Sequence, residues 1–226
     1  MTEHFNIAID GPAGAGKSTI AKMVAKKLGF VYVDTGAMYR TMALHCIRLG
    51  LDPADEAAVA RACREVDVTI RYEDGAQQVV LNGENVSGLI RTEEVGSMAS
   101  AISVYMPVRE KLVELQQELA RQTSVIMDGR DIGTCVLPDA PAKIYLTASV
   151  KVRAERRYLE LRQKGVACDQ GAIEADIKER DDRDMHREHS PLKQADDAVL
   201  LDSSAMTIEQ VADAIIEIAK EHGLEG

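Results

Sequence analysis

Glycine, lysine and hydroxyl residues stand close together near the start of the chain, in the run GPAGAGKST. Its first and last glycines and the pair Lys17-Ser18 fit the pattern GxxxxGK(S/T), whose chemistry is the binding of phosphate groups. Glycines there let backbone N–H groups turn toward phosphate oxygens, and the N-terminus of a following helix adds partial positive charge. The lysine of such a loop reaches the β and γ phosphates, and the hydroxyl ligates Mg²⁺. The run therefore predicts a nucleoside triphosphate site with Ser18 as metal ligand, formed by Gly11, Pro12, Ala13, Gly14, Ala15, Gly16, Lys17, Ser18 and Thr19.

The loop lies between a predicted strand and a predicted helix, which is the context that its chemistry requires. FNIAI is a short apolar run, and apolar residues then recur at helical spacing from Ile20 to Leu28 until Gly29 closes the helix. Asp52 and Pro53 have the residue types of a cap and a first helical position. Five apolar strands separated by helices predict a mostly parallel sheet covered on both faces. The strands are expected at 5–9, 30–33, 124–128, 143–147 and 198–202, and the helices at 37–49, 53–65, 107–121, twice between 149 and 188, and at 207–221.

One segment departs from this alternation of strands and helices. DVTIRYEDGAQQVVLNGEN alternates apolar and polar residues around the Asp-Gly pair at 74–75, which is the signature of an antiparallel hairpin. We interpret residues 66–100 as a small inserted domain. The remaining residues, 1–65 and 101–226, are then expected to form the core domain.

A second glycine turn, DTGAMYR, follows the second predicted strand and ends at Arg40. Ligands of open α/β sheets bind where strands end, so an arginine there indicates a second anion site, although a plain surface arginine remains an alternative. The chain has no Asn-Lys-x-Asp run of the kind that reads guanine in GTPase switches. Asp128 is followed by Gly129, Arg130 and Asp131, where mechanical ATPases usually place a water-orienting glutamate.

Arginines also recur at helical spacing in the last third of the chain. Arg183 and Arg187 stand four residues apart, a like-charge pair that costs an isolated helix about 0.2–0.5 kcal/mol. Such clusters in an acidic protein indicate phosphoryl groups arriving between them, although local pairs with Asp181, Asp182 or Glu155 remain an alternative. One helix carries Arg180, Arg183, Asp184 and Arg187, the preceding helix carries Arg153, Arg156 and Arg157, and Arg40, Arg109 and Arg130 lie elsewhere.

Composition narrows the class of protein. The chain has 226 residues, of which 46% are hydrophobic and 28% charged, and its formal net charge of -10 argues against a polynucleotide partner. Four cysteines without CxxC pairing indicate reduced thiols and no metal centre. No apolar run is long enough for a membrane span or a signal peptide, so we expect a cytoplasmic protein.

The combination of IAIDGPAGAGKST, VDTGAMYR, SGLIRTEEV, DGRDIGT, PAKIYLTASVKVRAERR and IKERDDRDMHR resembles the bacterial cytidylate kinases over essentially the whole chain. The resemblance implies a P-loop kinase fold of the α/β class: a five-stranded parallel sheet flanked by helices, a small antiparallel-β nucleotide-binding insertion, and a short mobile lid at about 153–187. It implies Mg²⁺-dependent transfer of the γ-phosphoryl of ATP to CMP or dCMP, giving CDP or dCDP and ADP, in pyrimidine nucleotide metabolism. The expected partners are these small molecules alone, with neither nucleic acid nor membrane, and the expected state is a monomer.

The resemblance also assigns roles to single residues. A carboxylate at Asp131 can accept from the N4 amine of cytosine, whereas uracil would set an acceptor against it. Thr35 stands where some members have serine, which keeps the hydroxyl. Ser100 and Arg109 would complete the base pocket, Arg180 and Asp184 would approach the ribose, and Arg40 and Arg130 would hold the acceptor phosphate. The residues implied to bind the acceptor nucleotide are Thr35, Arg40, Ser100, Arg109, Arg130, Asp131, Arg180, Asp184 and Arg187.

The implied chemistry needs no dedicated base, because a phosphomonoester with a second pKa of about 6 is already an anionic nucleophile at neutral pH. Cations that compensate charge are needed instead, and the lid arginines Arg153 and Arg157 would enter only on closure. The catalytic residues are expected to be Lys17, Arg130, Arg153, Arg157 and Arg180. Three alternatives stay open: a regulatory P-loop switch, a kinase of another nucleoside monophosphate, and a kinase of a non-nucleotide metabolite.

Overall fold

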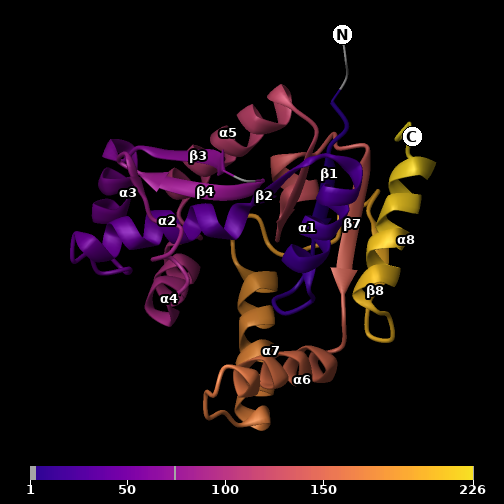
Figure 1. Ribbon diagram of the computed structural model, residues 1–226. Helices are drawn as coiled ribbons and strands as arrows, with labels where there is room; N and C mark the ends of the chain where they lie inside the picture. Colours follow the sequence, from indigo (N-terminus) through magenta and orange to yellow (C-terminus); the bar gives the residue numbers. More distant parts are fainter. Residues whose placement is uncertain (1–3, 74, 226) are drawn as a thin grey trace. The chain divides into compact units, whose positions relative to one another are not determined.

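The computed structural model describes residues 4–73 and 75–225, which form two compact units (Figure 1). The first unit runs to Tyr32 and resumes at Thr123, and the second is Val33–Gln122. The predicted insertion at 66–100 lies within the second unit, together with helices that the sequence analysis placed in the core domain. The domain boundaries therefore stay a prediction. Among the described residues no helix is long and apolar enough to cross a membrane.

A five-stranded parallel sheet has the order β2-β6-β1-β7-β8, and all five predicted strands are confirmed. β1 lies in the middle, pairs in parallel with β6 and β7, and has all of its residues buried. Because parallel strands end at one edge, the loops that follow β1 and β6 lie next to each other. The strands are β1 (Ile7–Asp10), β2 (Val31–Asp34), β6 (Val125–Gly129), β7 (Ala142–Thr147) and β8 (Val199–Asp202).

The core of the first unit forms where α1 and α8 cover one face of this sheet (Figure 1). Ile20 and Val24 from the predicted stripe of α1 pack with Ile7 and Ile9 of β1 and with Ile215 of α8, all of them buried. Burying side chains of this size stabilises the fold by about 1.5–3 kcal/mol each. Helices α6 and α7 pack against each other. The helices of this unit are α1 (Lys17–Leu28), α6 (Val150–Gln163), α7 (Gln170–His186) and α8 (Ile208–Glu221).

The second unit combines helices with a three-stranded antiparallel sheet of order β3-β4-β5, which confirms the predicted hairpin. Gly75 takes the left-handed conformation at φ +74° that its turn requires, while Asp74 lies outside the described residues. Helix α2 packs against β4 and α4. The elements are α2 (Thr35–Arg48), α3 (Glu56–Glu65), β3 (Val68–Glu73), β4 (Ala76–Leu81), β5 (Glu84–Asn85), α4 (Glu93–Ile102) and α5 (Met106–Gln122).

Two helices of the second unit differ from the sequence prediction. The predicted start of α3 at Asp52 and Pro53 is wrong, because Asp55 caps the helix by accepting the N–H of Ala58. Asp52 instead accepts the N–H of Ala54 in the preceding turn. Helix α4 is absent from the prediction, and it overlaps the end of the segment 66–100 that was interpreted as a small inserted domain.

A one-turn π-helix, η1 (Ile132–Val136), follows β6 directly and is also absent from the prediction. Single π-turns of this kind gather at functional sites, and this one comes straight after Arg130 and Asp131. No local sequence pattern predicts this π-helix. The side chain that holds it lies on another strand, as described below.

Candidate active site

The phosphate loop joins β1 to α1 through backbone conformations that only glycine adopts without strain. A Cβ at Gly11, whose φ is +148°, would lie 1.9 Å from the carbonyl oxygen of Leu146 on β7. Gly16 caps α1 in the left-handed conformation at φ +89°, so that Lys17 is the first helical residue. The two glycines of the predicted motif are therefore required by a close approach and by a left-handed turn.

Lys17 lies inside the loop and is almost fully buried. Its Nζ donates to the carbonyl oxygens of Gly11 at 2.7 Å and Pro12 at 2.8 Å. Burial, and then the charge of Arg130, hold the pKa of Lys17 well below its usual range. Asp128, Asp10 and Asp184 oppose this shift, and an anion arriving at the loop would oppose it further by adding opposite charge.

Ser18, the predicted metal ligand, is held by an aspartate at the end of β6. Ser18 Oγ donates to Asp128 Oδ2 at 2.8 Å, and Tyr32 Oη donates to Asp128 Oδ1 at 2.7 Å. With its proton directed to the carboxylate, the serine oxygen can offer a lone pair to a hard cation, so these residues fit Mg²⁺. Among the described residues no group of three or more His, Cys, Asp or Glu side chains could hold a metal ion.

Asp10, the last residue of β1, holds the π-turn that follows β6. Its carboxylate accepts the N–H groups of Ile132 and Gly133, both at 2.7 Å. Burial raises the pKa of Asp10 to about 6, although the two N–H donors and Lys17 oppose the rise. Asp131, at the cap position of η1, makes no capping hydrogen bond. The turn is therefore fixed by Asp10 and not by the side chain of Asp131.

Four of the predicted acceptor residues meet in the first unit as two ion pairs. Arg130 Nε donates to Asp184 Oδ2 at 2.8 Å, and Arg187 Nη2 lies 3.6 Å from Asp131 Oδ1. All four side chains are at most 21% exposed. Arg130 and Asp184 both lie close enough to Lys17 to shift its pKa. The end of β6 and the end of α7 therefore place these groups beside the phosphate loop.

The predicted like-charge pair on α7 is wrong. The helix ends at His186, and Arg187 takes an extended conformation with ψ 144° and donates from Nε to the carbonyl of Ser190. Arg183 remains on the helix, is exposed, and pairs with Glu179 at 2.9 Å. The alternative of an ordinary local ion pair therefore holds for Arg183, while Arg187 turns inward toward Asp131.

Arg153, predicted to enter the site only on closure, already contacts the phosphate loop. It is 3% exposed and binds Asp181 through two nitrogens, at 2.6 and 3.1 Å. It also donates to the carbonyls of Ala148 and of Ala13 in the loop, each at 2.9 Å. Arg157 is exposed and pairs with Glu160, and Arg180 is an exposed residue of α7, so their catalytic roles stay predictions.

The other predicted acceptor residues lie in the second unit. Thr35 is buried as the first residue of α2, and Arg109 of α5 is buried with Nη1 near the carbonyl of Ser103. Arg40 Nη1 donates to two carbonyls that precede α4, each at 3.2 Å. Burial, and then the nearby charge of Arg91, lower the pKa of Arg40. Ser100 is a partly buried residue of α4.

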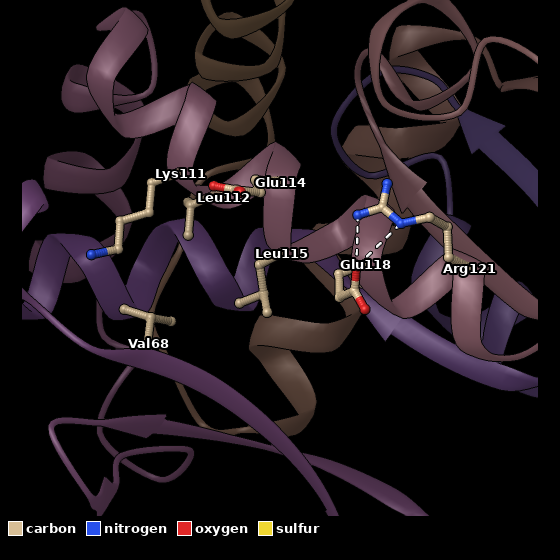
Figure 2. A pocket seen from close by; sticks show the side chains of 7 residues that line it. All are labelled: Val68, Lys111, Leu112, Glu114, Leu115, Glu118 and Arg121. Carbon is tan, nitrogen blue, oxygen red and sulfur yellow. Dashed lines mark hydrogen bonds and ion pairs between the residues drawn. The ribbon is translucent and has the colours of Figure 1, made fainter.

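A cavity of about 280 Å³ in the second unit is lined by α5 and the start of β3 (Figure 2). Three of its charged groups are engaged with protein atoms: Lys111 Nζ donates to the carbonyls of Cys63 and Val66, and Glu118 pairs with Arg121 at 2.7 Å. None of the predicted site residues lines it.

Three residues of the site were missed by the sequence prediction: Asp10, Tyr32 and Asp128. Asp10 is the last residue of β1, and Asp128 is the residue before the last of β6. An aspartate at the end of a buried parallel strand is itself a signal for a functional carboxylate. Tyr32 offers no such signal, because its hydroxyl reaches Asp128 only through the pairing of distant strands. The site thus holds more fixed carboxylates than the motifs alone indicate.

Comparisons with known proteins give matches over almost the whole chain. The family model described as "Cytidylate kinase" matches residues 7–221. A cytidylate kinase of Caldicellulosiruptor bescii is 50% identical over 214 residues, 95% of each chain, and one of Lactobacillus johnsonii is 50% identical over 217 residues, 96% of this chain and 94% of its own.

Solved structures share the fold at low sequence identity. A shikimate kinase from Acinetobacter baumannii, solved with shikimate, aligns with TM-score 0.50 and 15% identity over 98% of this chain and 96% of its own. An uncharacterized protein from Eubacterium ventriosum aligns with TM-score 0.54 and 12% identity over 96% of this chain and 99% of its own. These likenesses show the P-loop kinase fold alone. The family match and the relatives at half identity lead to one conclusion: the chain belongs to the cytidylate kinase family.

Proposed function

We propose that this kinase transfers the γ-phosphoryl of ATP to CMP or dCMP, giving ADP and CDP or dCDP. The observation that carries the proposal is the family match over residues 7–221, which spans both the phosphate loop and the turn after β6 that holds Arg130 and Asp131. Transfer to another nucleoside monophosphate is the second candidate, because a phosphate loop does not itself select the acceptor. A cytoplasmic, monomeric enzyme stays part of the proposal.

The residues of the first unit suit a reaction that depends on charge compensation. Lys17 neutralises the outer phosphates of the donor, and Arg130 holds the acceptor phosphate beside it. Mg²⁺ bound with the triphosphate would be held by Ser18, with Asp128 behind it, and would supply further neutralising charge. The acceptor phosphate needs no general base, because it is already ionised at neutral pH. Alignment of the two phosphates is then the task that remains for the protein.

A coupled assay of ADP release tests the proposal against its competitors. The protein is incubated with MgATP and, in parallel, with CMP, dCMP, UMP, AMP or shikimate. We expect ADP release to depend on the acceptor and to be fastest with CMP or dCMP. A preference for UMP or AMP would support the second candidate. Slow release that CMP leaves unchanged would indicate a nucleotide-dependent switch, and would contradict the proposal.

The Asp131 carboxylate is predicted to select cytosine. In Asp131→Asn the amide can donate as well as accept, so the penalty against uracil falls while the contact with the cytosine amine weakens. We expect the ratio of kcat/KM for CMP over UMP to drop by about 10- to 100-fold, as for one hydrogen-bonded position. Steady-state kinetics with the two nucleotides measures this ratio.

The matched control is Asp182→Asn, which changes an exposed aspartate of α7 and should leave the ratio intact. A capping role for Asp131 is already unsupported, since Asp10 holds the turn. Equal losses of rate with CMP and UMP in Asp131→Asn would place the carboxylate near the metal or the phosphates and remove it from the base pocket.

A further inference from the structure

Asp34 is the point from which α2 starts. It ends β2, and its Oδ1 accepts the N–H of Ala37, which caps the helix at 2.9 Å. Its Oδ2 accepts from Arg91 Nη2 at 2.5 Å. The side chain is therefore fully engaged within the second unit, and Asp34 is buried. Any force that fixes its main chain also fixes the first turn of α2.

The main chain of Asp34 is held by one side chain from the antiparallel sheet. The N–H of Asp34 donates to Gln77 Oε1 at 2.7 Å, and Gln77 Nε2 donates to the carbonyl of Asp34 at 3.2 Å. Gln77 lies on β4, so its amide takes the place that a neighbouring strand would take beside the end of β2. A buried backbone needs both of these partners, because an unmade hydrogen bond there is costly.

Two predicted acceptor residues depend on this anchor. Thr35 follows Asp34 directly, and Arg40 lies on the same helix less than two turns further on. Displacing either group would weaken its hydrogen bonds to the acceptor nucleotide and so lower the affinity for CMP. The hydrogen-bonded amide of Gln77 therefore controls where the hydroxyl and the guanidinium are presented.

We propose that Gln77 is a positioning residue for the acceptor nucleotide, acting through the main chain of Asp34 on Thr35 and Arg40. The inference rests on the proposed function, since it assumes that these two residues bind CMP. Gln77 acts only through Asp34 and does not itself contact the substrate in this proposal. It links the small antiparallel sheet to the acceptor-binding helix.

The neighbouring residue provides a matched control. Gln78 has the same side chain on the same strand but points to the opposite face of the sheet. Its Oε1 accepts from Asn85 Nδ2 of β5 at 3.1 Å. Gln78→Met and Gln77→Met thus remove the same chemical group from one strand, and only Gln77→Met releases Asp34.

Two measurements on the full chain test the inference. In Gln77→Met we expect the KM for CMP to rise about five- to tenfold, the effect of losing two hydrogen bonds, with the KM for ATP and kcat changed less than twofold. We expect exchange of the Asp34 amide proton, followed by NMR without nucleotide, to accelerate at least about tenfold. Gln78→Met should change neither quantity. Gln77→Ala provides a second truncation in case the methionine repacks.

The outcomes separate the inference from the proposed function. Faster exchange with an unchanged KM for CMP would overturn the positioning role, and so would equal effects of Gln77→Met and Gln78→Met. An unchanged exchange rate would show that the contact does not hold Asp34, which overturns the inference as well. If the unaltered protein shows no rate with CMP, the proposed function fails, and faster exchange in Gln77→Met would still establish the anchor.

Discussion

Lys17→Ala is expected to lower kcat at least about 100-fold, the usual effect of removing one preorganised electrostatic group from a transition state. The ammonium is nearly fully buried and is turned onto the carbonyls of Gly11 and Pro12. It is thus held in the loop before any phosphate arrives, and burial together with the charge of Arg130 holds its pKa well below the usual range. Initial rates at saturating MgATP and CMP measure the loss.

The fold should survive this substitution, because removing the buried ammonium also removes the cost of burying its charge. The control is Lys26→Ala, an exposed lysine in the last turn of the same helix, which should retain full activity. Near-normal turnover of Lys17→Ala, with an unchanged melting curve, would contradict the assignment of the loop to the donor phosphates.

Arg153→Met is expected to lower the free energy of unfolding by about 3–5 kcal/mol, since breaking a buried pair leaves Asp181 charged and without its partner. The pair is bidentate, and the side chains of Arg153 and Asp181 are 4% and 11% exposed. The same guanidinium also ties the carbonyl of Ala13, so the phosphate loop should loosen when it is removed. Urea unfolding at neutral pH measures the change.

Arg157→Met is the matched control for stability. Arg157 lies on the same helix in an exposed pair with Glu160, and such a pair contributes about 0–1 kcal/mol to the free energy of unfolding. Comparable decreases in the free energy of unfolding in the two variants would show that the buried pair is not the stabilising contact. The result also bears on the lid: a catalytic role for Arg153 requires its nitrogens to exchange Asp181 or Ala13 for phosphate oxygens.

The fold was predictable where a local pattern is sufficient. The apolar strands and the stripe containing Ile20 and Val24 follow from periodicity, and both are present. The order of the strands could not follow, because it depends on pairings between segments that lie 55 or more residues apart. Helix α4 could have been found: Thr92 is a capping residue, and Val95 and Ile102 stand at helical spacing.

The phosphate loop was predictable because its chemistry demands fixed residue types at fixed positions. The course of the chain around it was not. Arg187 was placed on a helical stripe, yet the helix ends one residue earlier and the side chain meets Asp131. Asp10 was overlooked, because its role depends on the π-turn that it holds across the sheet. Such roles arise from tertiary contacts that spacing along the chain does not encode.

Following a labelled γ-phosphoryl group tests most directly whether the protein transfers it from ATP to CMP. The protein is given ATP labelled at the γ position together with Mg²⁺ and CMP, and the products are separated. We predict that the label moves into CDP in step with the formation of ADP, with little inorganic phosphate, because the arginines and Lys17 hold the acceptor phosphate beside the donor. Label recovered as inorganic phosphate at a rate independent of CMP would contradict the account.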